Sequence, residues 1–349
     1  MTTAVRFLFL FVIGVLVAVS GLWQVLAVIY SWPLAGTAVR IPLAVLFAVV
    51  ALVTLVCLGF PRWRWRALGC HTILFAALLA GWLHIEPSNE RDWQTDVAVL
   101  PHATVEGDSV TVHNIRNFDY RSETDYTPAY YDKTFDLKKL EGVDLVAVYW
   151  MGPHIAHVFL SFAFAGDEHL AVSIETRKEN GEDYSTLKGF FRQYELYYVV
   201  ADERDVIRLR TNYRHDPPED LYVYRMAGSI ENGRRLFLEY MEKVNRLKDT
   251  PEFYNTLTTN CTTNIWMNAG VNAERIPFSW KILASGHVPE LLYEYGRIRT
   301  DGLPFDEVRQ RALVNARAQA ADQAADFSRR IRELDPGESV DSQKTEGKK

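Results

Sequence analysis

The chain has 349 residues, of which 48% are hydrophobic and 23% charged, and its formal net charge is −6. These averages hide an uneven distribution, because residues 1–85 contain no Asp or Glu and only five basic residues. Residues 86–349 therefore carry 33 basic and 44 acidic residues, a net charge of −11. This pattern excludes a wholly soluble enzyme and a disordered or collagen-like chain, and only three cysteines exclude a disulfide scaffold. The acidic second part offers no basic face, so no nucleic-acid partner is expected.

Residues 1–85 are predicted to form a membrane anchor of three transmembrane helices. Their charge-free stretches are 7–39, 41–60 and 67–85. Each stretch supplies about the 20 apolar residues that a helix needs to cross a bilayer. The first helix is expected over 7–29, with a turn at 31–36. A cleaved signal peptide has an apolar region of only about 7–15 residues, so retained helices are the better interpretation.

The arginines of this anchor predict its orientation. Arg62, Arg64 and Arg66 lie between the second and third apolar stretches. Positively charged loops stay in the cytoplasm, which sends everything after residue 85 to the other side. In a Gram-negative cell the chain is then a multi-pass protein of the inner (plasma) membrane whose C-terminal domain faces the periplasm.

Residues 86–300 are predicted to form one α+β periplasmic domain, because short strand-like and helical segments follow one another without regular repetition. Strands are expected at 110–113, 143–150, 157–164, 170–176, 196–201, 205–210 and 221–226. Helices are expected over 230–247, where apolar residues recur at helical spacing, and from about Cys261. Residues 301–334 are predicted to form a C-terminal amphipathic helix, helical from 304, and residues 335–349 a disordered tail.

Cys261 is the only cysteine of residues 86–349, since Cys57 and Cys70 lie in the predicted membrane helices. An unpaired thiol in an oxidising compartment is a liability unless it is buried or used. Asn260 is a cap-type residue, which places Cys261 in the first turn of a helix. A helix start favours the thiolate, which is the nucleophilic form. The alternative interpretation is a buried, inert cysteine.

A thiol nucleophile needs a base, and His157 is the candidate because it opens an alternating strand. Residues 165–168 predict a hairpin turn after that strand, which would set Glu175 roughly opposite His157. A carboxylate there would orient the imidazole, although a slip of one residue would exchange the two faces. The alternative is that His157 is an ordinary strand residue and that Glu175 pairs with Arg177. No cofactor is expected, and the His154–His157 spacing is a poor metal signal.

Six blocks of this sequence resemble the Lnb N-terminal periplasmic domain family. They lie at 113–126, 156–162, 173–179, 191–198, 202–214 and 251–263, so the resemblance runs from about residue 90 to about residue 290. The resemblance implies a circularly permuted papain-like thiol fold, related to NlpC and LRAT enzymes, with the histidine before the cysteine. The proteins that name the family are lipoprotein intramolecular transacylases.

By this resemblance Cys261 is the nucleophile, His157 the base and Glu175 the third catalytic residue. The implied function is acyl transfer on a membrane lipid or lipoprotein ester through an acyl-enzyme. The candidate substrate-binding residues are Tyr120, Arg121, Arg177, Tyr194 and Tyr197, although aromatic residues in strands are more often part of a core. Two alternatives remain: a thiol amidase or peptidase acting on peptidoglycan, and a catalytically silent protein that binds a lipid or a partner.

Overall fold

The structure is a computed structural model that describes residues 3–31 and 37–333. These residues divide into two compact units, each considered by itself. The helical unit contains the described residues up to Glu90, together with Asp183–Glu195 and Glu252–Thr256. The sheet unit contains Arg91–Glu182, Leu196–Pro251 and the described residues from Leu257 onward.

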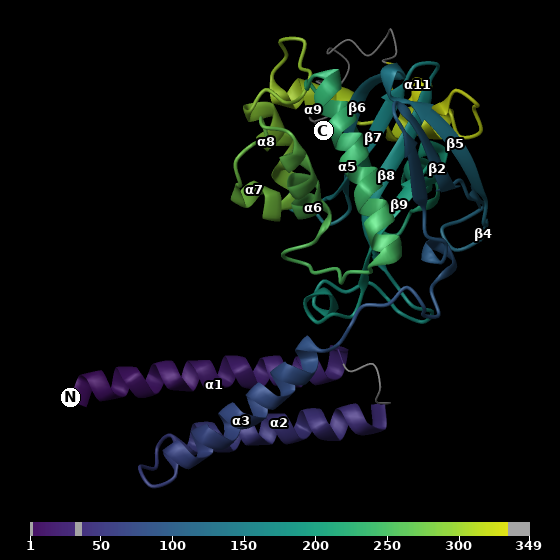
Figure 1. The fold of residues 1–349 in the computed structure, drawn as a ribbon. Coiled ribbons are helices and arrows are strands. Elements are labelled where there is room, and N and C mark those ends of the chain that lie inside the picture. The colour runs from purple at the N-terminus through teal and green to yellow at the C-terminus, as the bar shows by residue number, and fades with distance from the viewer. Residues whose placement is uncertain (1–2, 32–36, 334–349) are drawn as a thin grey trace, which may run out of the picture. The chain divides into compact units, whose positions relative to one another are not determined.

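Three long apolar helices dominate the helical unit (Figure 1): α1 (Thr3–Ser31), α2 (Thr37–Cys57) and α3 (Arg64–Leu83). Each is long and apolar enough to cross a membrane, since 20 helical residues extend about 30 Å. The three predicted helices are thus confirmed, with ends displaced by a few residues. The turn predicted at 31–36 lies outside the described residues except for Ser31.

Small and aromatic residues pack these helices against one another. A Cβ on Gly21 of α1 would lie only 2.5 Å from the Cβ of Ala51 on α2, so only glycine allows this close approach. The ring of Trp23 on α1 contacts Phe75 and Trp82 of α3, both at a centroid distance of 5.5 Å.

The loop Asp183–Glu195 caps the end of α3. Arg192 Nη1 donates hydrogen bonds to the carbonyls of Trp82, Leu83 and Ile85 at 3.2, 3.1 and 2.9 Å. Its guanidinium also lies 4.2 Å from the centroid of the Trp82 ring. A cation at a helix C-terminus satisfies carbonyls that the helix leaves without a partner. A loop about 100 residues further along the chain thus belongs to the same unit as the membrane helices.

The sheet unit is built on one mixed sheet of eight strands in the order β1-β2-β9-β8-β7-β6-β10, with β5 also paired to β2. The strands are β1 (His102–Glu106), β2 (Ser109–Arg116), β5 (Tyr130–Asp136), β6 (Leu140–Tyr149), β7 (His157–Phe164), β8 (Glu168–Arg177), β9 (Glu195–Ala201) and β10 (Asp220–Arg225). A small second sheet pairs β3 (Asp119–Tyr120) with β4 (Tyr126–Thr127). The predicted α+β class is confirmed, and six of the seven predicted strands are present.

The predicted hairpin joins β7 to β8. Its turn contains two residues with positive φ, Gly166 (86°) and Asp167 (63°), which are residue types that tolerate this conformation. The strands are antiparallel, with Leu160 opposite Val172 and Phe164 opposite Glu168. Continuing this register places His157 opposite Glu175, as the sequence predicted.

Helices cover both faces of the sheet. The predicted helix at 230–247 is α5 (Ile230–Asp249), and Cys261 opens α6 (Cys261–Asn268). The further helices are α7 (Trp280–Leu283) and α8 (Val288–Glu294). Single short turns are η1 (Thr95–Val97), η2 (Leu137–Lys139), η3 (Lys188–Phe190), η5 (Ala269–Val271) and η6 (Ser285–His287).

The strand predicted at 205–210 is wrong. Asp202 accepts a hydrogen bond from the Arg204 backbone amide and starts α4 (Glu203–Arg208), which continues into the π-helical turn η4 (Leu209–Tyr213). The short apolar pair Val206 and Ile207 fits a buried strand and a buried helix equally well, so the pattern alone did not distinguish them.

The single C-terminal helix predicted over 304–334 is also wrong. The segment forms α9 (Phe305–Ala312), α10 (Asn315–Ala320) and α11 (Phe327–Arg330). Between the first two, the Val314 amide donates to the Leu221 carbonyl at 2.9 Å, so β10 pulls the chain out of a helical path. The disordered tail predicted at 335–349 lies outside the described residues.

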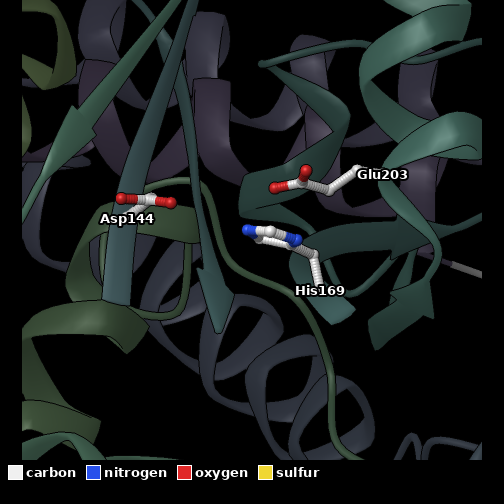
Figure 2. Close-up of side chains that lie close together, drawn as sticks. All are labelled: Asp144, His169 and Glu203. Atoms are coloured by element: carbon white, nitrogen blue, oxygen red, sulfur yellow. The ribbon is translucent and has the colours of Figure 1, made fainter. Parts of the chain in front are cut away.

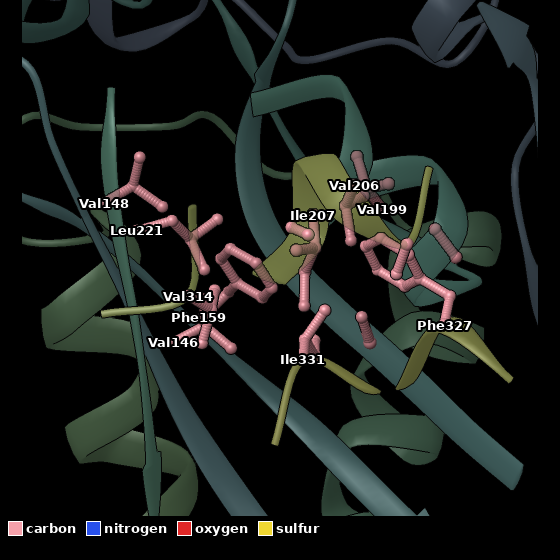
Figure 3. Close-up of a cluster of buried hydrophobic side chains, with 14 of the residues drawn as sticks. Val146, Val148, Phe159, Val199, Val206, Ile207, Leu221, Val314, Phe327 and Ile331 are labelled. Carbon is pink, nitrogen blue, oxygen red and sulfur yellow. The ribbon is translucent and has the colours of Figure 1, made fainter. Parts of the chain in front are cut away.

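The C-terminal helices complete a buried core on one face of the sheet. Figure 3 shows Phe327 and Ile331 packed with Val199, Val206 and Ile207. Phe327 and Ile331 have 0% exposure, and so has Phe159 of β7. The opposite face, with Phe162 and Phe164, packs against Phe237 of α5. Residues of β7 that alternate along the strand thus enter two different cores.

Phe327→Ala is expected to lower the free energy of unfolding by about 3–5 kcal/mol, because it leaves a cavity in this core. The measurement is thermal unfolding of the sheet unit's circular dichroism signal, with the full chain in detergent. Gln310→Ala, an exposed change on α9, is the control and should leave the transition in place. Equal midpoints for the two variants would show that the C-terminal segment is dispensable for this core.

Candidate active site

Cys261 occupies the first turn of α6, as predicted. The Asn260 side chain caps the helix by accepting a hydrogen bond from the Thr263 amide at 2.9 Å. Thr262 Oγ1 donates to the carbonyl of Ile282 at 2.6 Å, which fixes the turn that carries the cysteine. Cys261 is a free, partly exposed thiol. The first amides of a helix have no acceptor within the helix, so they favour a negative charge beside them.

His157 lies between Cys261 and two polar residues of β8. Its Nε2 is 2.7 Å from Ser173 Oγ and 3.0 Å from Glu175 Oε1, and Ser173 Oγ donates to Glu175 Oε1 at 2.7 Å. Cys261 lies close enough to the ring to raise the pKa of His157. Because Nε2 is engaged by Ser173 and Glu175, Nδ1 is the ring nitrogen available to the thiol. The structure therefore brings together all three predicted catalytic side chains.

The charges of this site favour a protonated histidine. Burial opposes protonation, but the negative charge of Glu175 and hydrogen bonds with Cys261 and Glu175 outweigh it and raise the pKa of His157 to about 9. Burial also opposes ionisation of Glu175, yet the positive charges of His157 and Arg210 hold its pKa well below the usual range. An imidazolium beside a thiol favours the thiolate, so the site is suited to a thiolate–imidazolium pair.

Two residues of this network were not predicted to belong to it. Ser173 was given no role, although its position two residues before Glu175 puts both side chains on one face of the strand. Arg210 Nη2 donates to Glu175 Oε1 at 2.9 Å, and its side chain is only 6% exposed. Arg210 lies in η4, within the segment that was misinterpreted as a strand, so no sequence pattern pointed to it.

The five candidate substrate-binding residues are engaged elsewhere. In the sheet unit, Arg177 donates to the carbonyls of Val97 and Ala98, Tyr197 donates to the Val99 carbonyl, Tyr120 donates to Asp205, and Arg121 pairs with Asp125 on the surface. In the helical unit, the Tyr194 hydroxyl donates to the Asp183 carbonyl at 2.6 Å. A role in substrate binding stays a prediction for all five. Glu175 pairs with Arg210 rather than with Arg177.

A second cluster of titratable side chains lies where β6, β8 and α4 meet. Figure 2 shows the side chains of Asp144, His169 and Glu203 close together, with one ligand-type atom from each lying within 4.8 Å of the others. Arg332 donates to Asp144 Oδ2 at 2.8 Å and to Glu203 Oε2 at 2.8 Å, and Arg225 Nε lies 2.6 Å from Asp144 Oδ1. The guanidinium groups of Arg225 and Arg332 thus neutralise the two buried carboxylates. The ion pairs hold Arg332 against the sheet, and the carboxylates do not form an open cation site.

Comparison with known proteins finds a family match for the segment that contains the candidate site. Residues 126–286 match the family described as the Lnb N-terminal periplasmic domain. This confirms the resemblance inferred from the sequence, over a segment that contains Cys261, His157 and Glu175 but not Tyr120 or Arg121. No curated protein and no solved structure matches the chain. Together with the three apolar helices, the family indicates a membrane protein with a periplasmic domain.

Glu175→Gln is expected to slow alkylation of Cys261 by iodoacetamide at pH 7 by a few-fold. The reason is that the negative charge of Glu175 raises the pKa of His157, so its loss weakens the positive charge that lies beside the thiol. Mass spectrometry of tryptic peptides separates this label from Cys57 and Cys70. The matched control is Glu168→Gln, a change on the same strand as Glu175. It removes an ion pair with Lys133 at the surface. Labelling that rises only well above neutral pH in every variant would identify an ordinary thiol.

Arg332→Ala is expected to destabilise the sheet unit by about 3–5 kcal/mol at neutral pH, because it leaves two buried carboxylates with less compensation. Burial opposes ionisation of Glu203, but the positive charge of Arg332 holds its pKa below the usual range. The ion pair therefore stabilises the fold at a pH above the usual pKa of a glutamate, and this stabilisation is lost as the pH falls and Glu203 takes up a proton. The difference in thermal midpoint from the native chain should therefore shrink below about pH 4. Arg329→Ala, an exposed neighbour, serves as control and should unfold like the native chain at every pH.

Proposed function

We propose that this protein is a thiol acyltransferase of the inner membrane whose periplasmic domain acts on a lipid or lipoprotein ester. The observation that carries the proposal is the contact chain from Cys261 through His157 to Ser173 and Glu175. A nucleophile, a base within hydrogen-bonding reach and a third group that orients the base are the parts that acyl transfer requires.

The order and placement of these residues support a permuted papain-like fold. The cysteine begins a helix and the histidine begins a strand, which is the arrangement that the family resemblance implies. In this chain the histidine strand precedes the cysteine helix, whereas papain-like enzymes have the cysteine first. The strand β7 and the helix α6 both belong to the sheet unit.

The proposed first half-reaction forms a thioester. The Cys261 thiolate attacks the ester carbonyl carbon, and the Cys261 amide at the start of α6 stabilises the oxyanion of the tetrahedral intermediate. As the C–O bond breaks, the His157 imidazolium donates its Nδ1 proton to the leaving alcohol. The products are an acyl-thioester on Cys261, a free alcohol and a neutral imidazole.

The proposed second half-reaction returns the site to its starting state. Neutral His157 accepts a proton from an incoming amine, whose nitrogen attacks the thioester carbonyl. Collapse of the intermediate breaks the C–S bond and restores the thiolate beside an imidazolium, with an amide as product. Glu175 and Ser173 hold Nε2 throughout, so the ring keeps Nδ1 directed at the sulfur.

The link between the two units is short. The helix α3 ends at Leu83, and the sheet unit begins at Arg91. Eight residue steps extend at most about 30 Å. The carbonyl carbon of a lipid ester lies at the membrane surface, within that distance of the end of a membrane helix.

The test is mass spectrometry of the full chain after incubation in detergent with phospholipid and a diacylated lipopeptide. The native chain and Cys70→Ser, a matched change in α3, should carry an acyl adduct on the peptide with Cys261 and should release acylated amine. Cys261→Ser should lower turnover by roughly 10³-fold or more.

Equal turnover by the native chain and Cys261→Ser would contradict the assignment of Cys261 as the nucleophile. Release of peptide fragments from peptidoglycan, without an acyl adduct, would favour the alternative that the same Cys–His pair is a thiol amidase or peptidase. Binding of lipid without any turnover would favour the alternative that the protein binds lipid and is catalytically silent.

A further inference from the structure

Exposed apolar side chains gather on one part of the sheet unit. Outside residues 151–155 and 257–283, the described part of this unit exposes only three large apolar side chains: Val105, Tyr295 and Leu313. Single exposed apolar side chains are ordinary on a protein surface, whereas a group of them marks an interaction site. Five of those within the two segments are here called the apolar rim: Met151, Ile155, Phe278, Trp280 and Leu283.

Contacts between histidines join the two segments of the apolar rim. The ring centroid of Trp280 lies 5.3 Å from that of His287. His287 Nε2 in turn lies 2.9 Å from Nδ1 of His154, which belongs to the loop 151–155. The Gly286 amide also donates to the His154 carbonyl at 3.0 Å. The apolar rim is therefore one surface and not two distant loops.

The apolar rim borders both reacting side chains of the candidate site. Ile155 lies two residues before His157, which begins β7. Thr262, the residue after Cys261, donates a hydrogen bond to the Ile282 carbonyl at 2.6 Å. Ile282 belongs to α7, the helix that also carries two residues of the rim. A partner that covers the apolar rim therefore lies beside the candidate site.

Charge is absent from the stretches of chain around this surface, although the chain after residue 85 is acidic. Residues 145–166 and 253–273 contain no Asp, Glu, Lys or Arg. The buried strands account for part of this, but the exposed loop 151–155 shares it. Lys281, within α7, is paired with two carboxylates at 3.0 and 2.6 Å. Covering such a surface removes few charges from water, so it suits an apolar partner and not a charged peptide.

The bilayer is the apolar partner that is always within reach of the sheet unit. The membrane helix α3 ends at Leu83 and the sheet unit begins at Arg91, so only a short link separates this unit from lipid. The C-terminal residues 334–349 contain only two large apolar residues, so they offer no apolar cover of their own. Tryptophan favours the boundary between lipid headgroups and hydrocarbon, and Trp280 is the most exposed aromatic side chain of the rim.

We propose that the apolar rim enters the lipid bilayer at the boundary between headgroups and hydrocarbon. Lipid ester carbonyls lie at this boundary, so the contact brings them to the side of the sheet unit that carries Cys261 and His157. The membrane contact itself goes beyond acyl transfer and exists whether or not the site turns over. Only its role in delivering lipid to Cys261 rests on the proposed acyltransferase function.

The first experiment measures the depth of nitroxide spin labels on the full chain in vesicles of phosphatidylethanolamine and phosphatidylglycerol. The labels are placed by Met151→Cys or Phe278→Cys in a chain whose three native cysteines are replaced by serine. Both labels should collide more with oxygen, which concentrates in hydrocarbon, than with a water-soluble nickel chelate. Val105→Cys, at an exposed apolar position of β1 outside the rim, is the matched control and should show the opposite preference.

Two outcomes would overturn the membrane contact. Rim labels with the same preference for the nickel chelate as the label at Val105 would show a surface that faces water. Rim labels shielded from both reagents would show a surface covered by protein, such as a second copy of the chain.

The second experiment tests delivery of lipid to the site. Trp280→Ser should slow formation of the acyl adduct on Cys261 from vesicle phospholipid about tenfold, since burial of one large aromatic side chain is worth roughly that factor. Alkylation of Cys261 by iodoacetamide, which arrives from water, should stay unchanged. Tyr295→Ser, at an exposed aromatic position outside the rim, is the matched control and should alter neither rate.

The two experiments separate the membrane contact from the transferase. Rim labels in lipid, with no acyl adduct on the native chain, would keep the contact and reject the transferase. An unchanged adduct rate in Trp280→Ser, or an equal loss of adduct formation and alkylation, would overturn the role of the rim in delivery.

Discussion

The register of the β7–β8 hairpin is the constraint on which the site depends. Gly166 and Asp167 turn the chain with positive φ, and every later pair of the ladder follows from that turn. Because side chains alternate between faces, a slip of one residue would turn Ser173 and Glu175 away from His157 and expose the polar side of β8 to the core packed on α5. The same apolar alternation that buries Phe159 and Phe162 on opposite faces therefore also fixes the geometry of the candidate site. Core packing and chemistry are two consequences of one register.

Charge extends this constraint beyond the hairpin. Glu175 holds His157 in its protonated form, but a buried carboxylate with a single partner would itself tend to take up a proton. Arg210 supplies a second positive partner, and Glu219 lies 3.9 Å from Arg210 on its other side. Arg210 reaches Glu175 because α4 continues into the wider turn η4. Val206 and Ile207 of α4 pack in the same core as the C-terminal helices. The ionisation of the site thus depends on a fold element that no catalytic residue belongs to.

The sequence was sufficient where a short-range rule decides the structure. Hairpin turn residues and alternation along β7 and β8 predicted that Glu175 lies opposite His157, and a cap residue predicted that Cys261 lies in the first turn of a helix. The family resemblance, and no short-range rule, joined Cys261 to His157. It failed where tertiary contacts decide. Residues 205–210 carry too short an apolar pattern to distinguish strand from helix, so Arg210 was missed, and Leu221 draws Val314 into a ladder contact that splits the expected C-terminal helix. Tyr120 and Tyr197 were predicted to line the site, and their hydroxyl partners lie on other segments that no local pattern reveals.

The same contacts explain how one histidine can serve both halves of the proposed transfer reaction. In the resting site Cys261 contributes to the raised pKa of His157 through its hydrogen bond and its charge, after the contribution of Glu175. Forming a thioester removes the negative charge on sulfur and its capacity to accept a strong hydrogen bond, so the pKa of His157 must fall in the acyl-enzyme. A residue that begins as a proton donor to the leaving alcohol then becomes a neutral acceptor for the incoming amine. Glu175 limits this fall, because its negative charge continues to raise the pKa of His157 in the acyl-enzyme. In the proposed reaction the charge of Glu175 therefore stays constant, whereas the charge of Cys261 is lost and restored.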